Sequence, residues 1–195
     1  LVPADIIYLN GNSLGPLTKK SQQRAQEVVS EQWGKDLIAS WNKHAWIDLP
    51  FIAGEKIAKI IGAAEHQLVC CDSVSINLLK ALACCLQMQP TRNILLSQKE
   101  NFPTDLYVAQ GLEALLGQTR CKLKTVAEPE LANALDKEVA VLFLSQVNFR
   151  NGDKHDIEKI TSLARAKGIL VVWDLSHSVG VLPLKIDEWE VDFAV

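Results

Sequence analysis

The chain has 195 residues, of which 48% are hydrophobic and 22% are charged, and its formal net charge is −3. A chain of this length and composition can bury one good-sized core. The weak negative charge gives no reason to expect nucleic acid or an anionic membrane as a partner, and no apolar run approaches the ~20 residues that cross a bilayer.

The amino-terminal part is predicted to be loop and helix. Residues 8–16 are rich in glycine, asparagine and proline, which favour turns, and therefore indicate a loop. Apolar residues at helical spacing predict a long helix over 18–40, followed by a tryptophan-rich loop over 41–50 and a second helix over 53–61. We therefore separate an amino-terminal segment, residues 1–50, from a domain that covers residues 51–195.

Strands and helices alternate in the second part. Strands are predicted over 67–71, 93–97, 121–126, 139–144 and 169–173, and helices over 75–87, 104–116, 129–135 and 157–167. This alternation is typical of βαβ units, so we expect an α/β fold with a mostly parallel sheet. Residues 191–195 look like the opening of another strand, so we expect the domain to be incomplete and the protein to continue.

Cysteine and histidine usage indicates reduced thiols and no metal site. Four of the five cysteines form adjacent pairs inside apolar runs, and no C-x-x-C occurs. This favours reduced core cysteines in a cytoplasmic protein. The four histidines lack metal-ligand spacing. The chain also lacks the glycine-rich fingerprints of dinucleotide and P-loop sites and the nucleophile elbow of α/β-hydrolases.

Asp174 directly follows the strand predicted over 169–173, and His177 comes three residues later. A carboxylate at the tip of a buried strand lies in the crevice where open α/β sheets bind ligands. Burying it is costly unless a cation or strong donor meets it. The protonated ring nitrogen of pyridoxal phosphate is such a partner. The alternative is that Asp174 caps the next turn.

Other predicted strand tips also carry polar residues. Residues 72–77 open a helix and are a candidate phosphate site, the alternative being that Ser73 or Ser75 only caps that helix. Ser145 follows a buried strand, and Arg150, beyond it, is either an anion ligand or a solvated loop charge. Because parallel strands bring their carboxyl ends to one edge, these side chains are expected to converge.

The segment between residues 101 and 105 lies between a strand and a helix. Phe102 is a candidate plate for a flat ring, and Asp105 a candidate hydrogen-bond acceptor in the first helical turn. The alternative is that Pro103 starts the helix, Thr104 and Asp105 favour its dipole, and Phe102 packs inward.

Five segments occur in the order NGNSLGP at 10–16, WNKHAW at 41–46, DSVSINL at 72–78, NFPTDLY at 101–107 and WDLSHSVG at 173–180. Taken together, they resemble the corresponding segments of bacterial kynureninases. The resemblance implies the large domain of the aspartate aminotransferase-like fold type I, dependence on pyridoxal phosphate and a homodimer. It also implies hydrolysis of L-kynurenine, or its 3-hydroxy form, to the anthranilate product and L-alanine, a step of tryptophan catabolism, the kynurenine pathway and NAD biosynthesis.

The resemblance also assigns roles to residues. Val74 and Ser75 would contact the cofactor phosphate. Phe102 would stack on the cofactor ring with Asp105 close by. Asp174 would pair with the ring nitrogen. Ser145 and His177 would be further cofactor contacts. Trp41, Asn12 and Ser13 would lie at the substrate.

One feature departs from the family pattern. The lysine that holds the cofactor would fall a few residues beyond Val195. Lys185 follows Asp174, but we expect it in a surface turn and do not assign it this role. We therefore expect little or no turnover from this chain alone. Two alternatives stay open: another type I enzyme such as a cysteine desulfurase, against which the tryptophan cluster argues, and a non-catalytic fragment that only folds or associates.

Overall fold

The computed structural model describes residues 2–195 and divides the chain into two compact units. The first contains the residues up to 58 together with 65–70, and the second contains 59–64 together with 71–195. The predicted loop over 8–16 is confirmed, since residues 2–18 contain no helix or strand and the first helix is α1, Lys19–Glu27. In the part of the chain that is described, no helix is both long and apolar enough to span a membrane.

The helix predicted over 18–40 ends early. It runs through α1, a π-helical stretch over Val28–Trp33 and α2, Gly34–Asp36, and it stops at Leu37, whose φ is 47°. Ser40 Oγ then donates to the Gln32 carbonyl oxygen at 2.9 Å and satisfies the helix end. The break is therefore fixed by a contact that the helical periodicity does not contain.

The tryptophan-rich segment is more helical than predicted. It contains α3, Ser40–Lys43, a 3₁₀ turn over Trp46–Asp48 and the start of α4, Leu49–Ile61. The second predicted helix thus begins at Leu49 rather than residue 53, with Pro50 in its first turn, where the missing N–H costs no intrahelical bond.

The predicted strand over 67–71 is wrong. The segment has no regular secondary structure and pairs with no described strand, and Cys70 N donates to the Pro50 carbonyl oxygen at 3.0 Å. It passes so close to α4 that a Cβ at Gly54 would lie 2.2 Å from the Leu68 carbonyl oxygen. The apolar run is therefore a connection beside α4 in which only Leu68 is half-buried, because no neighbouring strand is there to bond it.

The second unit confirms the parallel α/β prediction. Its strands are β1, Ile94–Gln98; β2, Lys122–Val126; β3, Val139–Ser145; β4, Leu170–Asp174; and β5, Phe193–Ala194. They form one parallel sheet in the order β2-β1-β3-β4-β5. The strand expected over 191–195 is therefore present as β5.

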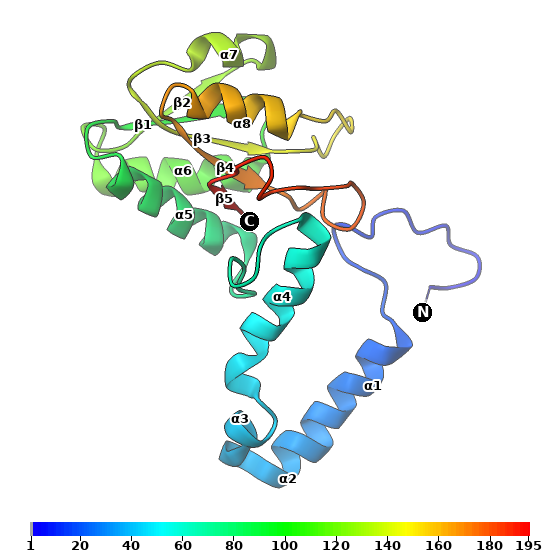
Figure 1. Ribbon diagram of the computed structural model, residues 1–195. Coiled ribbons are helices and arrows are strands. Elements are labelled where there is room, and N and C mark those ends of the chain that lie inside the picture. The colour runs from blue at the N-terminus through cyan, green and yellow to red at the C-terminus, as the bar shows by residue number, and fades with distance from the viewer. Residues whose placement is uncertain (1) are drawn as a thin grey trace. The chain divides into compact units, whose positions relative to one another are not determined.

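Helices cover both faces of this sheet. They are α5, Val74–Met88; α6, Pro103–Leu116; α7, Leu131–Ala134, preceded by a 3₁₀ turn over Glu128–Glu130; and α8, Ile157–Arg165. Figure 1 shows α5 and α6 on one side of the sheet and α7 and α8 on the other. Leu82, Leu95 and Phe143 belong to the core between the first pair and the sheet. On the other face, the Trp173 indole donates to Thr161 Oγ1 at 3.0 Å.

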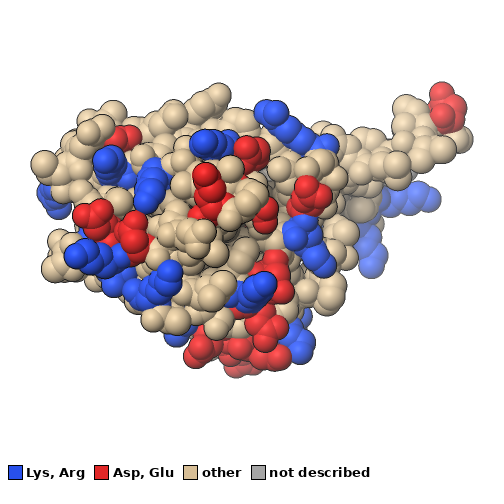
Figure 2. Space-filling view, turned by 90° about the horizontal axis from the view of Figure 1, so that it is seen from above, with Lys and Arg blue, Asp and Glu red and all other residues tan. Residues whose placement is uncertain are grey.

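The prediction of core cysteines is correct for only two of them. Cys85 and Cys121 are buried, whereas Cys70, Cys71 and Cys84 are exposed as free thiols. Apolar neighbours in the sequence did not determine which face of the segment each thiol occupies. On the face drawn in Figure 2, acidic and basic side chains are interspersed.

Candidate active site

The strand order places a topological switch between β1 and β3. The chain leaves β1 to form β2 on one side and returns to form β3 on the other. In open parallel sheets, ligands bind outside the carboxyl ends of the strands at such a point. Here those ends carry Gln98, Ser145 and Asp174.

Asp174 is 3% exposed and accepts two hydrogen bonds. Ser176 N donates to Asp174 Oδ1 at 2.9 Å and Ser176 Oγ donates to the same oxygen at 2.5 Å. Asp174 therefore does cap the following turn, as the alternative interpretation held. Because both bonds use Oδ1, Oδ2 is the oxygen left for a further donor.

Asp105 has the more unusual environment. It is 1% exposed, and neither of its carboxylate oxygens has a hydrogen-bond partner among the described residues. Burial, and to a smaller extent the negative charge of Asp174, raises the pKa of Asp105 to about 7. A buried polar group without a partner calls for an explanation, and a missing ligand is one.

Phe102 lies at the entrance to α6. It is the N-cap residue, and the helix starts at Pro103 as the alternative interpretation predicted. Its half-buried ring lies 5.0 Å from the Phe149 ring and 6.4 Å from the His177 ring, measured between centroids. Phe102 is therefore part of an aromatic cluster that joins three loops of the sheet edge.

The start of α5 is open to an anion. Ser73 is the N-cap residue by position, but its side chain makes no capping hydrogen bond. Val74 is exposed and Ser75 half-buried. The Asp72 carboxylate, which would repel an anion, is paired with the Lys80 ammonium, and this hydrogen bond lowers the pKa of Asp72. The Ser73 side chain therefore does not cap this helix, contrary to one of the alternative interpretations.

The remaining predicted residues lie in the first unit or outside the sheet edge. Trp41 is 47% exposed and packs edge-on against Trp46, with 6.1 Å between ring centroids, and Asn12 and Ser13 lie in the exposed amino-terminal loop. The structure thus groups the cofactor candidates in the second unit and the substrate candidates in the first.

Two charged residues have surface roles. Lys185 Nζ lies 3.0 Å from Glu188 Oε1 in an exposed turn, and the neighbouring Ile186 N donates to the Ile61 carbonyl oxygen. Arg150 lies over the Phe149 ring, 5.2 Å from its centroid. No group of three metal-ligating side chains is found within residues 2–195.

Sequence analysis missed several polar residues that build this edge. Asn101 and Ser97 are buried and hydrogen-bonded to each other, and His155 Nε2 lies 2.7 Å from Gln98 Oε1. Asn101 was part of a recognised motif, but nothing in the spacing indicated which side chain of the loop turns inward.

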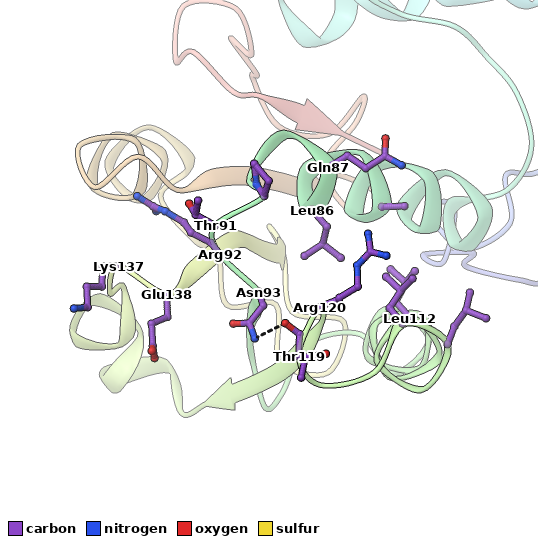
Figure 3. A pocket seen from close by; sticks show the side chains of 14 residues that line it. Leu86, Gln87, Thr91, Arg92, Asn93, Leu112, Thr119, Arg120, Lys137 and Glu138 are labelled. Atoms are coloured by element: carbon purple, nitrogen blue, oxygen red, sulfur yellow. Dashed lines mark hydrogen bonds between the residues drawn. The ribbon is translucent and has the colours of Figure 1, made fainter.

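Two pockets lie at opposite edges of the sheet. One of about 850 Å³ opens at the amino ends of β1, β2 and β3, where Arg120 points between Leu86 and Leu112 (Figure 3). It contains none of the predicted site residues. The other, of about 10 Å³, is lined by Asn101, Phe102 and Ser145 among others. We place the candidate site at the carboxyl edge of the sheet, where the Asp105 and Asp174 carboxylates and the aromatic cluster lie. Neither carboxylate lines the smaller pocket.

Comparison with known proteins agrees with this architecture. The family model described as aminotransferase class-V matches residues 52–195. Kynureninase of Burkholderia mallei (strain SAVP1) is 43% identical over the whole chain, which covers 48% of that relative, and kynureninase of Pseudomonas fluorescens is 41% identical with the same coverage. The chain spans about half the length of these curated relatives.

Solved structures share the fold. A NifS-like protein superposes with a TM-score of 0.77 at 18% identity, over 96% of this chain and 53% of its own. A C-DES mutant with glycine covalently linked to its PLP cofactor superposes with a TM-score of 0.76 at 19% identity, over 98% of this chain and 52% of its own. The predicted type I fold is thereby confirmed.

Proposed function

We propose that this chain, which belongs to the aminotransferase class-V family, is part of a kynureninase that uses pyridoxal phosphate to hydrolyse L-kynurenine to anthranilate and L-alanine. One observation carries the proposal. Two buried carboxylates, Asp105 and Asp174, lie at the carboxyl edge of the sheet beside the Phe102 and His177 rings, in a chain 43% identical along its whole length to a kynureninase.

The residues at this edge suit the cofactor. Asp174 has one carboxylate oxygen committed to Ser176 and the other available for a protonated ring nitrogen. Asp105 has no partner on either oxygen among residues 2–195, and its pKa of about 7 lets both its protonated and its ionised form exist near neutral pH, so it can donate to a ligand atom or accept from it. The open start of α5, at Val74 and Ser75, offers backbone N–H groups to a phosphate.

The cofactor supplies an electron sink for the carbanion formed at the substrate α-carbon. The chain supports that chemistry in defined ways. Asp174 would hold the ring nitrogen in its protonated form, and Phe102 would lie against the ring. Ser145 and His177 would be further contacts of the cofactor. In the first unit, Trp41, Asn12 and Ser13 would contact the substrate.

Several further properties belong to the same proposal. The protein acts as a homodimer in the cytoplasm, in tryptophan catabolism and NAD biosynthesis, on L-kynurenine or its 3-hydroxy form. Residues 1–50 serve as a substrate segment, and 51–195 are part of the cofactor domain. By the resemblance, none of the lysines among these 195 residues is the one that binds the cofactor, so the 195 residues alone would give little or no turnover. The desulfurase alternative has only fold similarity in its favour, at 20% identity for a cysteine desulfurase of Thermococcus onnurineus.

The substitution Asp174→Asn in the full-length protein tests the assignment. It preserves the size of the side chain and removes the charge that holds the ring nitrogen protonated. We expect kcat to fall about a hundredfold or more, with the fold retained by circular dichroism. The matched control is Asp153→Asn, at an exposed carboxylate of the loop after β3, which should retain wild-type kcat. Near-wild-type turnover in Asp174→Asn would refute the role.

A further inference from the structure

The two strands on either side of the switch point, β1 and β3, separate before they end. The ladder between β1 and β3 pairs Leu95 with Val141 and Leu96 with Leu142, and pairs no later residue. On its other side, β3 stays paired with β4 as far as Ser145 and Asp174. The main-chain groups of β3 that face β1 beyond Leu142 therefore need partners from elsewhere, because buried main-chain groups are rarely left unbonded.

Two buried side chains supply these partners. Asn101 Oδ1 accepts from Ser145 N at 2.8 Å, and Asn101 Nδ2 donates to Ser97 Oγ at 3.0 Å. Ser97 Oγ in turn donates to the Phe143 carbonyl oxygen at 2.7 Å. Ser97 is 0% exposed, Asn101 7% and Ser145 8%. The Asn101 amide thus takes the place of the strand ladder where the ladder stops.

The position of Asn101 connects this network to the site. It directly precedes Phe102, the N-cap residue of α6, and the first turn of that helix carries Asp105. On the other side, Ser145 is the register partner of Asp174. One side-chain amide therefore ties the loop that carries the aromatic ring to the strand tip beside the Asp174 carboxylate.

We propose that Asn101 is a positioning residue that fixes Phe102 and Asp105 relative to Ser145 and Asp174, and so sets the orientation of the cofactor ring. The proposal rests on the proposed function. Asn101 is not a catalytic residue, since its amide oxygen and nitrogen are both bonded to protein groups. Its effect on a ligand passes through the neighbours that it holds.

The test uses the full-length protein, first titrated with pyridoxal phosphate to obtain the Kd and then saturated with it. In Asn101→Ala, we expect the Kd for pyridoxal phosphate to rise about tenfold, because the two hydrogen bonds of the Asn101 amide, to Ser145 and Ser97, are lost. We also expect a changed visible circular dichroism band of the bound cofactor, which reports ring orientation, and a kcat about tenfold lower at saturation. Asn133→Ala, at an exposed asparagine of α7, is the matched control and should match wild type in all three measurements.

A purely structural role predicts a different pattern. Asn101→Ala would then lower Tm but keep wild-type kcat and a wild-type dichroism band once saturated, and that result would overturn the proposal. If Asn101→Ala does not fold, Ser97→Ala decides. It removes the acceptor of Nδ2 and leaves the bond to Ser145, so we expect smaller changes in the same direction. If Ser97→Ala changes none of the three measurements, the proposal is overturned. A wild-type protein that binds no pyridoxal phosphate would instead refute the proposed function itself.

Discussion

Asp105 makes the stability of the unliganded chain depend on pH in a direction opposite to that of most carboxylates. Its pKa is raised from an ordinary 3.8 to about 7 in the folded chain. Between these values the folded chain keeps the proton while the unfolded chain has lost it, so the free energy of unfolding falls as pH rises through this window. A shift of about three units corresponds to a loss of up to about 4 kcal/mol above pH 7.

The substitution Asp105→Asn isolates this effect. The neutral amide has nearly the same shape, and its own burial adds only a pH-independent cost of about 1–3 kcal/mol. The variant should therefore gain stability relative to wild type by up to about 4 kcal/mol between pH 4 and pH 8, with the gain levelling off above pH 7.

Urea denaturation of the 195-residue chain without cofactor, followed by tryptophan fluorescence at several pH values, measures the difference. Asp153→Asn, at an exposed carboxylate, should give a curve parallel to wild type. Parallel curves for wild type and Asp105→Asn would refute the claim that Asp105 is buried with no partner.

Three further outcomes follow from local contacts. Asp156→Ala removes the side chain that accepts from Lys159 N at 3.0 Å at the start of α8, so urea denaturation should show a loss of about 1 kcal/mol, and no loss would contradict this cap. Gly54→Ala places a Cβ 2.2 Å from the Leu68 carbonyl oxygen, so it should lower stability by about 2 kcal/mol or more, and an unchanged Tm would mean that this close approach does not exist. Phe102→Leu in the full-length protein should weaken pyridoxal phosphate binding about three- to tenfold in a fluorescence titration, since ring stacking contributes about 0.5–1.5 kcal/mol; an unchanged Kd would contradict the stacking role.

The sheet was predictable because its central strands are buried on both faces. The apolar runs that became β3 and β4 have no alternation, and their observed limits differ from the predicted ones by at most one residue. The apolar run at 67–71 looked similar but has no strand beside it, so it is a connection packed on α4. An apolar run by itself predicts neither burial nor pairing, because both depend on a neighbour that the local sequence does not describe.

The limits of the long amino-terminal helix were less predictable. Leucine is a good helix former, yet Leu37 adopts a positive φ and ends the helix. The observed break is stabilised by Ser40, which bonds back to Gln32 eight residues earlier. Such a contact exists only after the chain has folded back, so helical periodicity alone extended the prediction too far.

The candidate site was predictable where one rule applied. Parallel strands bring their carboxyl ends to one edge, and this placed Ser145 and Asp174 together. The role of Asn101 depends on where the ladder between β1 and β3 stops, which spacing does not encode. The lack of any partner for Asp105 likewise appears only in the packed structure.

The most direct test of the proposed function is product analysis of the full-length protein incubated with pyridoxal phosphate and L-kynurenine. We predict anthranilate and L-alanine in equal amounts, formed only when the cofactor is present. Absence of both products, together with release of sulfur and alanine from L-cysteine, would contradict the kynureninase proposal and support the desulfurase alternative.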